Sequence, residues 1–192
     1  MSMKLGAVLL AAGSSTRFGS NKLLADYGGR PLVCRALEAM HAVFPAKACV
    51  VTGCAEVAAL AEEYGCQVIV NSCPELGQSH SIHLGVQAML EMDAILFLVG
   101  DQPLLRAESL LLLTKSYLSA GKGIACLRDQ THMGNPAIFG AKHYPELLAL
   151  SGDRGAKGVL RAHDKDLLVV RAIGANELSD ADTPQMLDQI RI

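Results

Sequence analysis

The sequence predicts an α/β fold in which helices cover a mostly parallel sheet. Segments with strand patterns alternate with segments of helical periodicity along the 192 residues. The apolar runs Val8–Leu10 and Ile95–Val99 lack polar alternation, which is typical of parallel strands buried on both faces. Because no linker, repeat or low-complexity segment interrupts this pattern, we expect a single domain over residues 1–192.

The expected elements follow one another along the chain. Short apolar segments predict seven strands, namely Leu5–Ala11, Ala48–Thr52, Gln67–Val70, Ala94–Val99, Gly123–Leu127, Pro136–Phe139 and Leu167–Arg171. Apolar side chains at helical spacing and capping patterns predict helices, namely over Val33–Phe44, from Ile82 to near Met92, over Arg106–Ser119 and over Pro184–Ile190. Pro31 suits the first turn of the first of these helices.

Composition and charge exclude several classes of partner. The formal net charge is −2, aromatic residues make up 4% and tryptophan is absent. Without a basic run or stacking residues, we expect neither a nucleic-acid partner nor a membrane surface. No apolar run approaches the roughly 20 residues that span a bilayer, and the N-terminal run is too short for a signal peptide. We therefore expect a cytoplasmic protein.

The cysteines predict packing rather than chemistry. None of the six belongs to a C-x-x-C pair; they are Cys34, Cys49, Cys54, Cys66, Cys73 and Cys126. In a reducing compartment we expect them to be small core side chains, not a disulfide framework or a zinc site.

The loop after the first strand carries the clearest chemical signal. Small residues at Ala11, Ala12 and Gly13 let a ligand approach backbone amides closely. Arg17 and Lys22 then add two positive charges suited to phosphate oxygens. The segment lacks the spacing of a Walker A loop or of the dinucleotide fingerprint. It predicts a polyphosphate site, with a plain strand-to-helix connection as the alternative.

Two acidic segments predict a metal site. Asp101 follows a buried strand, between Gly100 and Pro103, and open α/β sheets bind ligands at the carboxyl ends of their strands. Mg²⁺ takes one or two protein carboxylates together with phosphate oxygens, so Asp101 is one candidate ligand. The segment from Asp180 to Pro184 offers a second. The alternative for both segments is helix capping.

Two further polar segments are candidates for ligand contacts. Gly77, Ser79 and Ser81 precede a helix, where backbone amides favour phosphate; simple capping by Ser79 or Ser81 is the alternative. His80 and His83 lack a third metal ligand nearby in sequence. The second segment is the glycine-rich stretch 151–157, where Arg154 and Lys157 are available for an anion and helix capping by Asp153 is the alternative. The sequence shows no Ser-His-Asp or G-x-S-x-G pattern, which leaves transfer chemistry that depends on positioning and charge.

These motifs together resemble the MobA-like nucleotidyltransferases. The resemblance rests on Leu10–Gly19, Lys22–Leu24 and Gly29–Leu32, with later matches in the family's order. These later matches lie at Gly77–Ile82, Gly100–Leu104, Gly134–Pro136, Gly152–Ala156 and Asp180–Pro184. Gly100–Leu104 is similar to the molybdenum cofactor cytidylyltransferase branch. The resemblance implies a three-layer, Rossmann-like fold with a mixed, mostly parallel sheet.

The same resemblance implies a reaction and its residues. CTP would transfer CMP to the molybdopterin cofactor with release of pyrophosphate, in an Mg²⁺-dependent reaction. It implies catalytic roles for Arg17, Lys22 and Asp101, and Mg²⁺ ligands at Asp101 and Asp182. It implies nucleotide contacts from Leu10, Ala11, Ala12, Gly13, Arg17, Lys22, Asn71, Gly77, Ser79, Ser81 and Gly100. Asn135, Asp153 and Arg154 would contact the acceptor.

The choice of substrate stays more open than the use of a nucleotide. Ala12 stands where guanylyltransferases usually carry glycine, which favours CTP over GTP. Met133, Asn135 and Lys157 depart from residues common in the family, and all three fall in the acceptor half. Two alternatives therefore remain: transfer to another phosphorylated acceptor, and a non-catalytic accessory protein that binds a molybdenum hydroxylase apo-enzyme.

Overall fold

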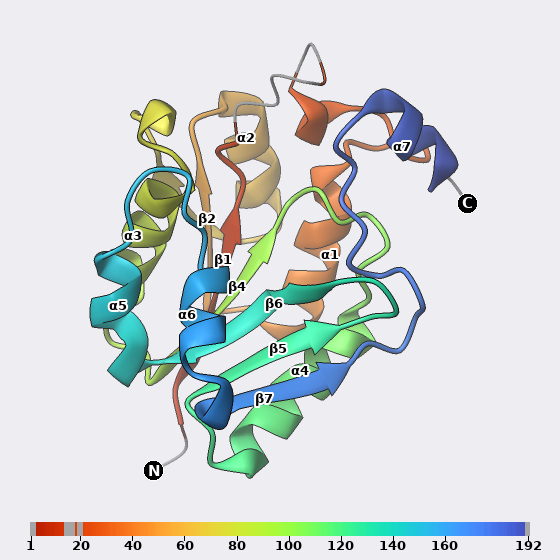
Figure 1. The fold of residues 1–192 in the computed structure, drawn as a ribbon. Helices are drawn as coiled ribbons and strands as arrows, with labels where there is room; N and C mark the ends of the chain where they lie inside the picture. Colours follow the sequence, from red (N-terminus) through yellow and green to blue (C-terminus); the bar gives the residue numbers. More distant parts are fainter. Residues whose placement is uncertain (1–2, 14–17, 19–20, 191–192) are drawn as a thin grey trace.

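A computed structural model describes residues 3–13, 18 and 21–190 of the chain. Its centre is a seven-stranded sheet in the order β3-β2-β1-β4-β6-β5-β7, with helices packed on both faces (Figure 1). Neighbouring strands run parallel except where β6 pairs with β4 and with β5. The expected three-layer, Rossmann-like α/β fold with a mixed, mostly parallel sheet is confirmed.

The strands agree with the sequence pattern except at a few ends. They are β1 Leu5–Leu10, β2 Ala48–Thr52, β3 Gln67–Val70, β4 Ala94–Val99, β5 Ile124–Arg128, β6 Met133–Gly140 and β7 Leu167–Arg171. β1 ends one residue earlier than expected, so Ala11 already belongs to the loop. β6 begins three residues earlier than expected. Its first residues pair with the end of β5 beyond a register shift, a tertiary contact without a local apolar pattern.

The helices differ more from expectation. The helix expected from Ile82 begins at Gln78, so Ser79 and Ser81 lie within it rather than ahead of it, and neither side chain caps it. The α-helices are α1 Val33–Val43, α2 Ala55–Glu63, α3 Gln78–Ala88, α4 Ala107–Ala120, α5 Tyr144–Leu148, α6 Lys157–Ala162 and α7 Pro184–Gln189. Four 3₁₀ turns are η1 Lys22–Leu24, η2 Pro74–Leu76, η3 Ala141–His143 and η4 Asp164–Asp166. Pro31 is not in the first turn of α1: it lies ahead of Leu32, the N-cap, and forms an isolated bridge with Asp26. This bridge closes the turn before the helix.

The core lies on both faces of the sheet. Alternate residues of each central strand face opposite layers, so Leu9 packs with the layer of α1, α2 and α4, whereas Val8 packs with that of α3, α5 and α6. Both side chains are fully buried. A β-carbon on Gly85 of α3 would lie 2.6 Å from Val8 Cγ1. α3 therefore packs closely on the sheet and holds its N-terminus above the carboxyl ends of the strands.

Burial of the cysteines agrees only in part with the prediction. Cys34, Cys49, Cys66 and Cys126 are buried, whereas Cys54 and Cys73 are partly exposed. The two exceptions follow β2 and β3 in loops rather than lying within elements. None of the six forms a disulfide. Within the described ranges, none of the helices is both long and apolar enough to cross a membrane.

Candidate active site

The first part of the site is the loop after β1. β1 and β4 are parallel neighbours with Leu10 opposite Val99, so the residues that follow both strands meet at one edge of the sheet. The Gly100 amide donates to the Leu10 carbonyl at 3.3 Å. On the other side, the Thr52 hydroxyl donates to the Ala11 carbonyl at 3.0 Å. Hydrogen bonds from both neighbouring strands thus hold the beginning of this loop.

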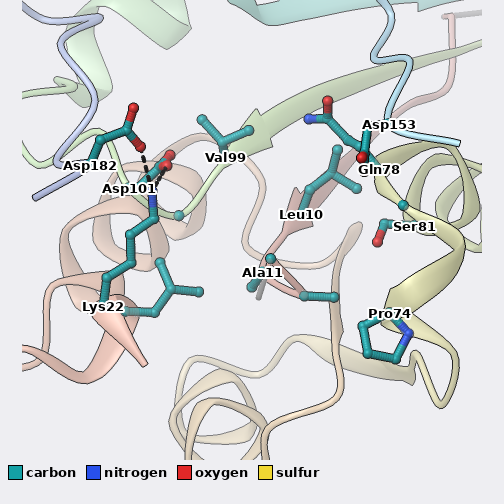
Figure 2. Close-up of a pocket in the computed structure, with 15 residues that line it drawn as sticks. Leu10, Ala11, Lys22, Pro74, Gln78, Ser81, Val99, Asp101, Asp153 and Asp182 are labelled. Carbon is teal, nitrogen blue, oxygen red and sulfur yellow. Dashed lines mark hydrogen bonds and ion pairs between the residues drawn. The ribbon is translucent and has the colours of Figure 1, made fainter. Parts of the chain in front are cut away.

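Lys22 is the centre of charge in the site. Its ammonium Nζ lies 2.6 Å from Asp101 Oδ2 and 2.9 Å from Asp182 Oδ1, although these carboxylates are far apart in sequence (Figure 2). Lys22 begins η1, and the Asn21 side chain caps this turn by accepting the Leu23 amide. Burial alone lowers the pKa of Lys22, but the two carboxylates outweigh that effect and raise it. The lysine is therefore a fixed cation.

The C-terminal segment reaches this site through a small apolar cluster. Ala181 and Leu187 pack with Tyr27 and Leu32. The Ala181 amide also donates to the Asp101 carbonyl at 2.9 Å, which places Asp182 beside Asp101. Capping also occurs here, but by Thr183, whose hydroxyl accepts the amide of Met186. Both readings of the segment from Asp180 to Pro184, metal site and helix cap, are therefore geometrically compatible.

The acidic groups have the chemistry that a hard divalent cation requires. Asp101 Oδ1 is buried and has no hydrogen-bond partner among the described residues. Burial and the charge of Asp101 raise the pKa of Asp180, whose Oδ1 accepts from the Gln102 side chain at 3.0 Å. Lys22 alone does not neutralise Asp101 and Asp182. A divalent cation on their carboxylate oxygens would satisfy the unpaired oxygen and outweigh the remaining negative charge, which leaves positive charge for phosphate, so these residues fit Mg²⁺.

The start of α3 forms the opposite wall. Gly77 has φ +84°, and a β-carbon there would lie 2.5 Å from the Gly152 carbonyl carbon, so only glycine fits this approach. The Ser79 amide donates to the Gly152 carbonyl at 3.1 Å. Behind this wall, Asn71 Nδ2 donates to the Ser81 hydroxyl at 3.0 Å. The α3 N-terminus and the 151–157 segment are thus held together.

These segments enclose a cavity of about 330 Å³ at the carboxyl edge of the sheet (Figure 2). Most of the predicted site residues line it, namely Leu10, Ala11, Ala12, Gly13, Lys22, Gly77, Ser81, Gly100, Asp101, Asp153 and Asp182. Asn71 and Ser79 are buried and do not line it. Arg17 lies outside the described residues. The nucleotide role predicted for each of these residues stays a prediction.

A second cavity of about 340 Å³ adjoins the first. Gln78, Val99, Asp101 and Asp153 line both cavities. Asn135 lines the second one, whereas Arg154 lines neither and borders a separate depression beside α5 and α6. The structure therefore brings together two of the three predicted acceptor residues and places the third apart.

Gln78 was not among the predicted site residues, and Lys157 was expected only to be available for an anion. Gln78, in the first turn of α3, lines both cavities and lies beside Asp153 in Figure 2, and Lys157 lines the second cavity. Gln78 lies inside the Gly77–Ser81 motif. Its position at the N-terminus of a helix is the sequence signal that could have identified it as a site residue. The charge of Lys157 is evident from the sequence, but which cavity its side chain lines depends on how α6 packs.

Comparisons with known proteins point to one family. The sequence model of the MobA-like NTP transferase domain matches residues 7–167. A protein of Pyrococcus horikoshii named probable molybdenum cofactor guanylyltransferase is 29% identical over 162 residues, which cover 84% of this chain and 81% of that protein. The bifunctional protein GlmU of Rhodospirillum rubrum is 33% identical over 120 residues, 61% of this chain and 27% of GlmU. The chain thus spans about a quarter of GlmU.

Solved structures share the whole fold. Rv0371c of Mycobacterium tuberculosis superposes with a TM-score of 0.83 at 21% identity, over 100% of this chain and 98% of that one. A manganese complex of Rv0371c superposes with a TM-score of 0.80 at 20% identity, over 98% of both chains. At this identity the likeness concerns the fold alone, but the sequence model covers most of the chain. The protein therefore belongs to the family of MobA-like NTP transferase domains.

Proposed function

We propose that this protein transfers CMP from CTP to the molybdopterin cofactor and releases pyrophosphate. The observation that carries the proposal is the Lys22 ammonium between Asp101 and Asp182, at the edge of a cavity that adjoins a second one. The first cavity borders the small-residue loop and would take the nucleotide. The second would take a phosphorylated acceptor, and the residues shared by both would lie near the transferred phosphorus.

In this reaction a phosphate oxygen of the acceptor attacks the α-phosphorus of CTP. The new P–O bond forms as the bond to the oxygen bridging the α- and β-phosphates breaks, and pyrophosphate carries that electron pair away. Positioning and charge neutralisation can supply such catalysis without a covalent intermediate. Lys22 would donate to an α-phosphate oxygen and stabilise its developing charge. Arg17 is proposed to bind the departing β- and γ-phosphates.

Asp101 and Asp182 are the proposed Mg²⁺ ligands. Bound Mg²⁺ would neutralise phosphate charge, which Asp101, Asp153 and Asp182 would otherwise repel. Asp101→Asn should shift the Mg²⁺ dependence of pyrophosphate release to higher concentration, with Asp164→Asn on the exposed turn η4 as the matched control. An unchanged Mg²⁺ titration in Asp101→Asn would remove this residue from the metal site.

Asn135 and Asp153 are the proposed acceptor contacts, and Lys157 lines the same cavity. Arg154 would join them only after a movement of its loop, since it borders a different depression. The acceptor is tested by pyrophosphate release at fixed CTP and Mg²⁺, with molybdopterin compared with sugar and polyol phosphates. Pyrophosphate release with a sugar phosphate but not with molybdopterin would identify the sugar phosphate as the acceptor instead. Co-purification with a molybdenum hydroxylase without any release would favour the accessory role.

The identity of the nucleotide base is the part of the proposed reaction for which a second candidate has support. Ala12 lines the cavity, and its methyl group would narrow the space beside a base, which favours cytosine. The Pyrococcus relative, in contrast, is named a guanylyltransferase. A thermal-shift panel of CTP, GTP, ATP and UTP with Mg²⁺ separates the two, because selective binding stabilises the folded protein. Selective stabilisation by CTP supports the proposal, and selective stabilisation by GTP replaces it with guanylyl transfer.

A further inference from the structure

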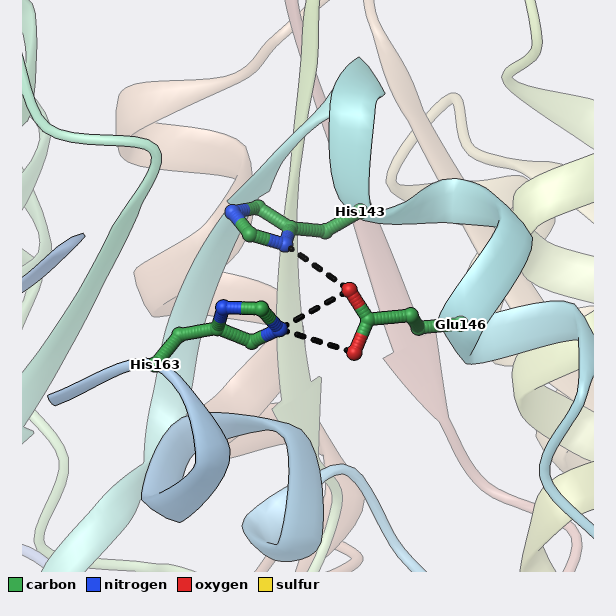
Figure 3. Close-up of side chains that lie close together, drawn as sticks. All are labelled: His143, Glu146 and His163. Carbon is green, nitrogen blue, oxygen red and sulfur yellow. Dashed lines mark hydrogen bonds and ion pairs between the residues drawn. The ribbon is translucent and has the colours of Figure 1, made fainter.

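A cluster of two histidines and a glutamate lies outside both cavities. His143 ends η3, Glu146 lies in α5, and His163 follows α6 (Figure 3). One potential ligand atom from each residue lies within 4.8 Å of the other two. The three side chains point toward one another from segments separated by the α5–α6 loop.

The distances between the potential ligand atoms of these side chains are similar to those between ligands of one metal ion. His143 Nδ1 lies 3.5 Å from Glu146 Oε1, and His163 Nε2 lies 2.8 Å from either Glu146 oxygen. With ligands about 2.0–2.1 Å from zinc, two ligand atoms of a tetrahedral site lie about 3.3 Å apart. Both Glu146 pairs lie near this value and the two histidine nitrogens lie within 4.8 Å of each other, so side-chain rotations would bring all three atoms to zinc.

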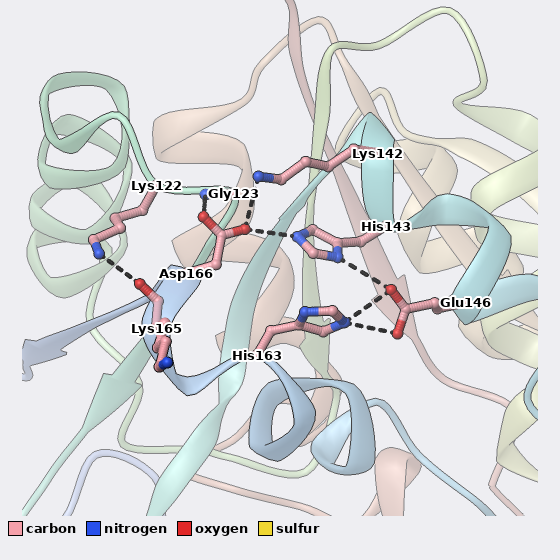
Figure 4. A network of polar contacts seen from close by, with 8 residues as sticks. All are labelled: Lys122, Gly123, Lys142, His143, Glu146, His163, Lys165 and Asp166. Carbon is pink, nitrogen blue, oxygen red and sulfur yellow. Dashed lines mark hydrogen bonds and ion pairs between the residues drawn. The ribbon is translucent and has the colours of Figure 1, made fainter.

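Hydrogen bonding orients His143 as a ligand. Its Nε2 lies 3.0 Å from Asp166 Oδ2, a carboxylate that also accepts from Lys142 Nζ at 2.8 Å and from the Gly123 amide at 2.9 Å (Figure 4). Because this carboxylate is an acceptor, the Nε2 proton is directed to it. A second carboxylate that holds the far nitrogen of a ligating histidine is a recurrent feature of zinc sites.

The near nitrogen of His143 is then left as an unpaired acceptor. His143 is 4% exposed, and its Nδ1 is buried without a hydrogen-bond partner in the part of the chain that the structure describes. In this tautomer its lone pair faces the Glu146 carboxylate, which is also an acceptor. A cation between the buried nitrogen and the half-exposed carboxylate would satisfy both acceptors.

We propose that His143 Nδ1, His163 Nε2 and the Glu146 carboxylate bind a divalent transition-metal ion, with Zn²⁺ as the matching probe. Two imidazoles and one carboxylate suit zinc and leave a fourth position for water. Binding needs the Nε2 lone pair of His163, so the proton shared with Glu146 would leave to solvent. The site is separate from the carboxylates beside Lys22, which offer oxygen ligands only.

Such an ion would hold both ends of one functional loop. Glu146 in α5 precedes the loop, and His163 follows α6 after it. Between them lies Asp153, which lines both cavities. Zinc would therefore tie α5 to the end of α6 and limit the movement of the loop that carries Asp153.

The test is a Zn²⁺ titration by calorimetry on the full chain, after chelator treatment and in excess Mg²⁺, which prefers oxygen ligands. We expect His163→Ala and Glu146→Gln to weaken the Zn²⁺ affinity by about 100-fold or more, and Asp166→Asn by about 10–100-fold. His41→Ala on α1 and Asp182→Asn are matched controls and should leave this binding event unchanged. At 100 times Kd, Zn²⁺ should raise the melting temperature of wild type by about 5–10 °C.

Two results would overturn the proposal. One is Zn²⁺ binding of equal affinity in wild type and His163→Ala, which would assign the ion to the cysteines or to the carboxylates beside Lys22. The other is the absence of saturable Zn²⁺ binding, which would leave His143 as a protonated partner of Glu146. Glu146→Gln keeps the side-chain volume at a half-exposed position, so it remains informative if an alanine variant does not fold.

Discussion

The ammonium group of Lys22 holds two carboxylates that would otherwise repel each other. Its distances of 2.6 and 2.9 Å to Asp101 and Asp182 place a fixed positive charge beside the proposed phosphate position. Lysine is a compact point charge on a flexible stem. If a divalent cation bound the two carboxylates in place of the ammonium group, a small movement of the Lys22 side chain would carry that group from the carboxylates to a phosphate oxygen.

Lys22→Ala should therefore reduce kcat by about 10²–10³, the usual cost of removing one electrostatic donor to the transition state. The measurement is pyrophosphate release at saturating nucleotide and Mg²⁺. Lys47→Ala, an exposed residue before β2, is the control and should leave kcat unchanged. Wild-type turnover in Lys22→Ala would reject the lysine as the charge stabiliser.

Asp129 is a second residue whose charge has a measurable role. Its buried carboxylate accepts the amides of Thr131, His132 and Leu178 at 2.7–2.9 Å. Burial alone raises the pKa of Asp129, but these backbone donors outweigh it and lower the pKa below the ordinary value of 3.8. The carboxylate thus ties the β5–β6 turn to the C-terminal segment.

Asp129→Asn should lower the free energy of unfolding at pH 7 by about 1–3 kcal/mol, since a buried charged acceptor is lost. Because the pKa of Asp129 is lower in the folded than in the unfolded state, the ionised carboxylate stabilises the folded protein above pH 3.8. That stabilisation is lost as the pH falls through the folded-state pKa. Denaturant unfolding between pH 7 and pH 2 should therefore show a shallower acid dependence in Asp129→Asn than in wild type. Glu62→Gln, exposed on α2, is the control. Equal acid dependence in Asp129→Asn and wild type would contradict the prediction.

At the scale of elements, the meeting of α3 with the 151–157 segment shapes the cavity wall. Gly77 allows this meeting because its φ is +84° and its α-carbon faces Gly152. The strands around the site could be predicted because apolar runs are local signals. The close approach at Gly77 could not, since the sequence does not record which distant backbone passes beside a glycine.

Gly77→Ala should lower the free energy of unfolding by more than about 1 kcal/mol, because the new methyl group meets backbone at a strained φ. It should also weaken nucleotide binding, since the wall must shift. Gly158→Ala in α6 is the matched control: its β-carbon meets nothing within 4 Å, and we expect a gain of about 0.4–1 kcal/mol. Chemical denaturation and nucleotide titration check both variants, and equal stability of the two would refute the role given to Gly77.

At the scale of the whole molecule, the sheet divides the core into two apolar layers, and two of the six thiols are only partly buried. Burial raises the pKa of Cys49 to about 12 and that of Cys126 to about 11. Reactivity requires both access and the thiolate. Cys54 and Cys73 are the two with access.

A thiol reagent should therefore label two of the six cysteines rapidly in the folded protein. The other four should react only as fast as the molecule opens. Time-resolved labelling followed by peptide mass spectrometry identifies the sites. In Cys54→Ser/Cys73→Ser the rapid phase should vanish, and rapid labelling of Cys49 would contradict the packing described above.

The sequence by itself determined the strands, the small-residue loop that leads to Lys22, and the position of Asp101 just after a strand. These features depend on local composition and on the rule that parallel strands end at one edge. The tertiary structure decided which distant groups meet them. Asp182 reaches Lys22 because Ala181 bonds to Asp101. Arg154 borders a separate depression because its loop turns that way. Hydrogen bonds and packing between segments far apart in the chain produce no periodic pattern that could be recognised in the sequence.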